Sequence, residues 1–270
     1  MNNSHCPILT IAGSDSGGGA GIQADIKSIS ANGGYAASVI TATTAQNTQG
    51  VIDIHAIPIK HIIMQMRAVF DDINFKAIKL GMLHSPEVIK AVQETLDEYN
   101  ITNIIFDPVM VATSGDKLLN DDAVESLKAF LPKVRLITPN IPEAELLIGH
   151  PIDISNIETT CKDLSKLYHT SVLLKGGHLE HTDIMTDVLY NFESQKTTVI
   201  HNQSVKTKNT HGTGCSLSSS IATYAGLGFT LEDACIKGCE YLNKAISTGK
   251  DMNLGKGHGP VNHFYKLQKK

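Results

Sequence analysis

The sequence contains no tryptophan, few aromatic residues (5%) and only five cysteines among 270 residues. The cysteines are odd in number and no two of them are separated by two residues, which argues against a disulfide framework and favours reduced thiols. Cys235 and Cys239 lie one helical turn apart, but no neighbouring His or Cys completes a metal site. We therefore expect these two thiols to be small buried residues.

Long apolar runs and an excess of basic residues are also absent. No apolar run approaches the roughly 18 residues that cross a bilayer, and the first seven residues lack the basic start of a secretory signal. Lys and Arg number 23 against 27 Asp and Glu, a net charge of -4, which argues against a nucleic-acid binder. The sequence predicts a cytoplasmic protein with neither membrane nor nucleic acid as partner.

Short apolar runs alternate with helical patterns along the chain. The runs predict strands at 7–12, 36–45, 77–80, 103–106, 135–138 and 171–174, and the patterns predict helices at 22–31, 62–73, 86–99, 121–131, 157–168, 214–227 and 231–248. Residues 185–190 and 196–200 are typical of a hairpin at a sheet edge. No linker interrupts residues 1–270, so we expect one α/β domain, a three-layer α/β/α sandwich with a mostly parallel sheet.

Unusual polar and glycine residues follow these strands, where ligands bind in such sheets. Residues 207–215 lead into a helix of small residues, and Gly212-Thr213-Gly214 can aim backbone N–H groups at a phosphate. Cys215, in the first helical turn, would have a lowered pKa and could act as a base toward a hydroxyl. A plain glycine-rich helix entry and a small buried cysteine are the alternatives.

Residues 19–24 fit the glycine fingerprint of a dinucleotide site, which raises a nicotinamide-dependent oxidoreductase as one hypothesis. The second strand, however, carries no acidic residue to hold a ribose, and the next acid is Asp53. The glycines could instead bring the backbone close to a small flat substrate. Asp25 would then lie beside that substrate, or serve only as a carboxylate near a helix start.

A third polar segment, residues 140–143, places Asn140 and Glu143 three residues apart at a strand-to-helix turn. Their oxygens suit Mg²⁺, although a helix cap with Pro142 in the first turn is the favoured local interpretation. Lys175, before two glycines, is either a phosphate ligand or a solvated lysine.

Several of these motifs together resemble the hydroxymethylpyrimidine kinase branch of the ribokinase superfamily. The resemblance extends over nearly the whole chain and rests on residues 9–15, 18–25, 45–48, 81–83, 107–110, 138–144, 175–178, 209–215 and 255–261. It implies a ribokinase-like fold, ATP and Mg²⁺ as cofactors, and a homodimer.

The resemblance also implies roles for single residues. Gln46 would hydrogen-bond the pyrimidine, in a pocket lined by Gly13, Asp25, Thr44, Met82 and Val109. Gly212, Thr213 and Gly214 would form the anion hole, with Cys215 where many relatives carry an aspartate base. Lys175, Thr210 and Asn140 would lie on the nucleotide side, and Glu143 and Asp107 would hold Mg²⁺, through water. Ser16-Gly17 and Thr44 depart from residues found in some relatives, Pro-Ser and valine.

The implied activity is ATP-dependent phosphorylation of 4-amino-5-hydroxymethyl-2-methylpyrimidine, and of its monophosphate, in thiamine biosynthesis. A pyridoxine or pyridoxal kinase of the same superfamily is the nearest alternative. Gln46 favours the pyrimidine because a glutamine amide both donates and accepts hydrogen bonds. A non-catalytic metabolite-binding regulator would keep the pocket without needing Cys215 or the Mg²⁺ motif.

Overall fold

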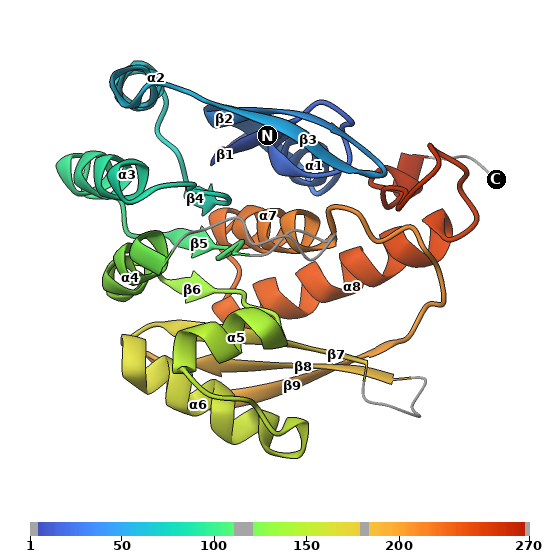
Figure 1. The fold of residues 1–270 in the computed structure, drawn as a ribbon. Helices are drawn as coiled ribbons and strands as arrows, with labels where there is room; N and C mark the ends of the chain where they lie inside the picture. Colours follow the sequence, from blue (N-terminus) through green and yellow to red (C-terminus); the bar gives the residue numbers. More distant parts are fainter. Residues whose placement is uncertain (1–4, 111–120, 179–183, 268–270) are drawn as a thin grey trace.

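The computed structural model describes residues 5–110, 121–178 and 184–267 (Figure 1). In this part of the chain nine strands form one sheet, in the order β3-β2-β1-β4-β5-β6-β7-β8-β9. The strands are β1 (Cys6–Asp15), β2 (Gly34–Asn47), β3 (Gly50–Ala56), β4 (Ala77–Leu80), β5 (Ile104–Phe106), β6 (Leu136–Ile137), β7 (Ser171–His178), β8 (Ile184–Asn191) and β9 (Lys196–Gln203).

The α-helices are α1 (Gly21–Ala31), α2 (Ile59–Phe70), α3 (Pro86–Glu98), α4 (Asp121–Phe130), α5 (Ile141–Ile148), α6 (Ile157–Tyr168), α7 (Thr213–Gly226) and α8 (Leu231–Gly249). Within the described ranges, none of them is long and apolar enough to cross a membrane.

The sheet is parallel from β2 to β7 and antiparallel at both edges. β1 pairs with β2 and β4 in parallel, and the series continues in parallel through β5 and β6 to β7. β3 joins one edge antiparallel to β2, and β8 and β9 form an antiparallel pair at the other edge. The mostly parallel α/β fold and the edge hairpin are confirmed.

Each central strand is buried on both faces because helices cover both. Leu9 and Ile11 of β1 pack into a core with α2 to α6, whereas Ile8, which directly precedes Leu9, packs into a second core with α1, α7 and α8. This alternation along one strand is what a period of two residues produces. The structure is therefore the expected three-layer sandwich (Figure 1).

Strand β3 was missing from the sequence prediction. Its side chains face solvent almost throughout, and Ile52 remains 76% exposed. Such a segment has no buried face to produce a recognisable pattern. It forms because a turn at Asn47 returns the chain along β2, where the backbone of 50–56 completes an antiparallel ladder.

Helix α7 lies close to its neighbours because most of its buried side chains are small. Ser216, Ser220 and Thr223 donate their hydroxyl hydrogens to backbone carbonyls four residues earlier, so these polar groups are satisfied inside the protein. Tight contact with α1 and the sheet holds the start of α7 at the carboxyl ends of the parallel strands.

Candidate active site

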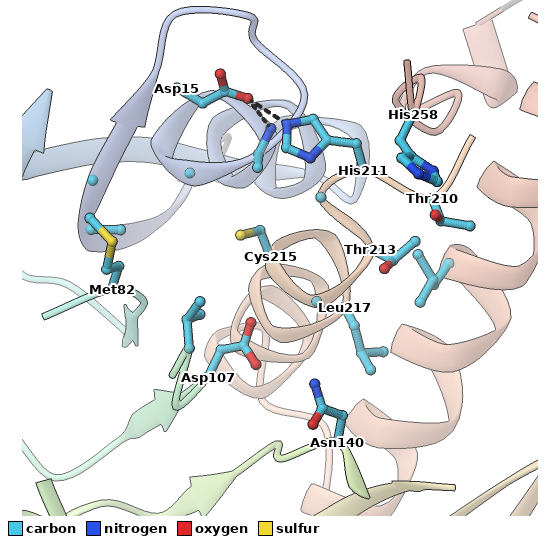
Figure 2. A pocket seen from close by; sticks show the side chains of 18 of the residues that line it. Asp15, Met82, Asp107, Asn140, Thr210, His211, Thr213, Cys215, Leu217 and His258 are labelled. Atoms are coloured by element: carbon cyan, nitrogen blue, oxygen red, sulfur yellow. Dashed lines mark hydrogen bonds and ion pairs between the residues drawn. The ribbon is translucent and has the colours of Figure 1, made fainter. Parts of the chain in front are cut away.

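A cavity of about 690 Å³ opens at the carboxyl ends of the parallel strands. Fourteen of the residues predicted for the site line it: Gly13, Thr44, Gln46, Met82, Asp107, Val109, Asn140, Glu143, Lys175, Thr210, Gly212, Thr213, Gly214 and Cys215. Figure 2 shows Cys215 at the first turn of α7, between the Asp15–His211 pair and Asp107. The fold thus brings together groups from nearly every strand of the parallel part.

The turn that begins α7 requires its glycines. Gly212 has φ +78°, the left-handed region, and a Cβ there would collide with the carbonyl oxygen of Gly19. A Cβ on Gly214 would lie 2.9 Å from a carboxylate oxygen of Asp107. Because no side chain stands between, the backbone N–H groups at the start of a fourteen-residue helix border the cavity directly.

A cluster of three charged groups lies beside this turn. Lys175 Nζ is 3.2 Å from Asp107 Oδ1 and 4.0 Å from Glu143 Oε2, and the Thr138 hydroxyl donates to the same Asp107 oxygen at 3.1 Å. Burial, with the nearby Asp107 charge, raises the pKa of Glu143 to about 7, although Lys175 opposes this. Burial by itself would lower the pKa of Lys175, but the two carboxylates raise it. Lys175 is thus an ion-paired lysine rather than a solvated one.

Asn140 and Glu143 form the helix cap that the sequence favoured. The Asn140 side-chain oxygen accepts from the Glu143 N–H, and Glu143 Oε2 accepts from the Asn140 N–H, both at 2.9 Å. This reciprocal capping box begins α5. It uses one oxygen of Glu143, so the cap is compatible with a further ligand at the other oxygen.

The thiol of Cys215 is where the sequence predicted it, but its expected acidity is wrong. Enclosure at the base of the cavity raises the pKa of Cys215 to about 11, against the opposing effect of the Lys79 charge. The expected lowering by the helix start is outweighed because burial penalises a thiolate more than the nearby positive charges favour it.

Asp25 does not line the cavity, contrary to the expectation from the resemblance. Both its carboxylate oxygens are 2.8 Å from Lys79 Nζ, and the hydroxyls of Thr10 and Ser219 also donate to it. Asp25 and Lys79 are fully buried, and it is Lys79 that borders the cavity. Asp25 therefore lies beneath the cavity floor and fixes a buried ammonium group there.

The sequence prediction missed two residues of the site, Asp15 and His211. His211 Nε2 is 2.9 Å from Asp15 Oδ2, and both residues line the cavity near Gln46. The position of His211 explains why residue 19, part of the glycine fingerprint, is a glycine, because a Cβ there would collide with the His211 ring. The signal was present in a polar residue that ends β1 and another that precedes α7, but no local pattern pairs residues 196 positions apart.

Comparisons with known proteins agree with this geometry. The model of the phosphomethylpyrimidine kinase family matches residues 15–262. A hydroxymethylpyrimidine/phosphomethylpyrimidine kinase of Rhizobium meliloti is 43% identical over 264 residues, covering 97% of this chain and 98% of the relative. A thiamine biosynthesis bifunctional protein of Geobacter sulfurreducens is 46% identical, and the match covers 95% of this chain but 52% of that protein. The chain thus spans about half the length of the bifunctional relative.

Solved structures show the same fold. A crystal structure of phosphomethylpyrimidine kinase from Clostridium difficile has a TM-score of 0.78 and 42% identity, covering 89% of this chain and 99% of that one. An ADP complex of Bacillus subtilis pyridoxal kinase has a TM-score of 0.88 at 29% identity, covering 98% and 100%.

Identity above 40% over nearly the whole length distinguishes the pyrimidine kinases from the pyridoxal kinases, which share the fold at lower identity. The oxidoreductase and the non-catalytic regulator considered from the sequence are set aside by the same matches. With its ribokinase-like fold and this cavity, the chain belongs to the phosphomethylpyrimidine kinase family and is a kinase.

Proposed function

We propose that this kinase transfers the γ-phosphoryl group of ATP to the hydroxymethyl oxygen of 4-amino-5-hydroxymethyl-2-methylpyrimidine, and then phosphorylates the resulting monophosphate, in thiamine biosynthesis. One observation carries the proposal. A single cavity joins Gln46, a hydrogen-bonding amide, to the Asp107–Lys175–Glu143 charges, and the turn at 212–215 lines the same cavity.

The chain's own groups would position the phosphates. The N–H groups of Gly212, Thr213 and Gly214 would bind the phosphoryl oxygens, that of Thr213 in exchange for its 3.3 Å hydrogen bond to the Thr210 carbonyl. Each donor would stabilise the transition state by roughly 3 kcal/mol. Lys175, Thr210 and Asn140 border the same cavity and would contact the nucleotide. Phosphoryl transfer depends chiefly on such positioning and charge neutralisation.

Cys215 would accept the proton of the substrate hydroxyl. The bond from the hydroxymethyl oxygen to γ-phosphorus forms, the bond to the ADP oxygen breaks, and the proton passes to the Cys215 thiolate. Because the pKa of Cys215 is about 11, the thiolate is a minor form at neutral pH. The positive charge of Lys79, which is ion-paired with Asp25, favours the thiolate form of Cys215. The pyrimidine itself would lie in the part of the cavity that is lined by Gly13, Thr44, Met82 and Val109.

Mg²⁺ fits the carboxylates of Asp107 and Glu143. Glu143 retains an oxygen outside the capping box, and its raised pKa indicates that a cation beside it would be stabilising. Across 5–110, 121–178 and 184–267, no three His, Cys, Asp or Glu side chains gather as a metal site. The ion would therefore be held by one or two protein groups with water and phosphate, and would neutralise phosphate charge.

Pyridoxal phosphorylation is a second candidate, since Staphylococcus aureus pyridoxal kinase in complex with pyridoxal shares this fold with a TM-score of 0.87. A release assay for ADP tests both, with the hydroxymethylpyrimidine, its monophosphate and pyridoxal as acceptors. We expect ADP from both pyrimidines at rates well above that with pyridoxal. Pyridoxal as the far better acceptor would overturn the assignment.

We also propose that residues 1–270 act as one domain, as a homodimer in the cytoplasm. The unbroken sheet supports one domain, and the free cysteines fit a reducing compartment. Exposed Ile52 and Ile54 on the edge strand β3 support a contact with a second copy. Light scattering of the purified protein would test the dimer, and a monomeric mass would refute it.

A further inference from the structure

Gln46 lies between two side chains that contact the ends of its amide. In the structure its amide oxygen is 3.0 Å from the Thr44 hydroxyl, and its amide nitrogen is 3.4 Å from His211 Nε2. Its backbone is held by Ser16, whose hydroxyl accepts from the Gln46 N–H at 2.9 Å and donates to its carbonyl at 2.7 Å. Since the backbone is fixed, the remaining question is which end of the amide faces which neighbour.

The hydrogen on the His211 ring can be placed from its partner. Asp15 accepts N–H groups from Gly17 at 2.8 Å, Gly19 at 3.0 Å and Ala20 at 2.8 Å. Burial raises the pKa of Asp15, but the hydrogen bonds from His211 and the backbone outweigh it and lower the pKa. Asp15 is therefore a carboxylate and can only accept. His211 Nε2, at 2.9 Å from Asp15, must carry a hydrogen and donate it.

That hydrogen decides the orientation of the Gln46 amide. If His211 Nε2 carries the hydrogen, then the Gln46 amide nitrogen, 3.4 Å away, is a donor that faces another donor. The Thr44 hydroxyl also lies 3.0 Å from the Ser14 carbonyl, which can only accept. If Thr44 donates there, its lone pair is free to accept from Gln46. A half-turn of the amide exchanges its oxygen and nitrogen, so that the nitrogen donates to Thr44 and the donor–donor contact with His211 is removed.

We propose that Thr44 and the Asp15–His211 pair hold the Gln46 amide with its nitrogen toward Thr44 and its oxygen toward His211. This leaves one N–H donor and one oxygen lone pair side by side on the outer edge of the amide. A ring nitrogen beside an exocyclic amine, the edge of a 4-aminopyrimidine, offers the complementary acceptor and donor. Thr44 and His211 are thus positioning residues for substrate selection, an inference that rests on the proposed function.

The orientation is tested with Thr44→Val, which has nearly the same shape without the hydroxyl, and Thr44→Ser, the matched control that keeps it. The ligands are the hydroxymethylpyrimidine and its analogue without the 4-amino group, and calorimetry measures both affinities. We expect the wild type and Thr44→Ser to prefer the amine by about tenfold, the value of one good hydrogen bond. In Thr44→Val the preference should fall to about twofold or less.

An unchanged preference in Thr44→Val, with circular dichroism showing a folded protein, would overturn the inference. His211→Gln, whose amide can still donate to Asp15, should keep more of the preference than His211→Leu, and equal loss in both would also count against it. ADP release is measured separately. If the wild type prefers the ligand with the 4-amino group but releases no ADP, the proposed kinase reaction is refuted while this orientation of Gln46 is supported.

Discussion

The two ends of the cavity bind by different means. Near Gln46 the contacts are hydrogen bonds among an amide, hydroxyls and a His–Asp pair, and these groups also hydrogen-bond to one another. Near Lys175 the contacts are between full charges, with two carboxylates sharing one ammonium group. The first arrangement recognises the shape and polarity of a ring, whereas the second suits a charged phosphate and its cation.

This difference separates selection from catalysis. Changes at the amide end should alter the KM for the pyrimidine and leave the KM for ATP unchanged. Changes at the charged end and at Cys215 should alter kcat or the response to pH. The following predictions test that division, beginning with the largest expected effect.

Cys215→Ala should lower kcat by about 10²–10⁴, the usual contribution of a positioned general base, with little change in either KM. Cys6→Ala is a matched control, since that thiol is also half-buried but lies outside the cavity. Steady-state ADP release measures both variants. Near-normal turnover in folded Cys215→Ala would refute the base assignment.

Cys215→Asp should change the pH profile, because a carboxylate is ionised where the thiol is not. With the pKa of Cys215 at about 11, wild-type kcat should rise roughly tenfold per pH unit through the neutral range. In the aspartate variant kcat should become nearly flat above pH ~6. Profiles of equal slope would show that proton transfer to this residue does not limit turnover.

Glu143→Gln should stabilise the free protein at pH 8 but not at pH 5. The folded pKa of Glu143 is raised to about 7, so the native state binds its proton more tightly than the unfolded state does. Stability is therefore lost as pH rises from the ordinary glutamate range through 7. The gain at pH 8 should be on the order of 2 kcal/mol, measured by urea unfolding. The same gain at pH 5 would contradict this cause.

Ser16→Ala should have the smallest effect, a rise of about threefold in the KM for the pyrimidine with the KM for ATP unchanged. It removes two hydrogen bonds to the Gln46 backbone, but Ser16 is exposed and water can replace them. Ser16→Thr keeps the hydroxyl and serves as control. A larger change in the KM for ATP would break the division between the two ends.

Both positions where the sequence departs from some relatives contact Gln46. Ser16 hydrogen-bonds its backbone and Thr44 its side chain. In the sequence alone they are two separate departures, 28 positions apart. In the structure they belong to one hydrogen-bonded group, which explains how a more polar wall is accommodated.

The sequence was sufficient for the features that depend on neighbours along the chain. Alternating strands and helices, the glycine turn at 212–214 and the capping box at Asn140 and Glu143 each arise from local propensity, backbone freedom or short-range hydrogen bonds. Such features were predicted correctly because the residues that cause them lie within a few positions of one another.

Tertiary structure alone decided the burial and pairing of distant groups. It placed Asp25 beneath the cavity with Lys79, joined Asp15 to His211, paired exposed β3 with β2, and enclosed Cys215 so that its pKa rose instead of falling. Acidity depends on exclusion of water and on charges brought near through space. Neither quantity is set until the helices and strands have packed.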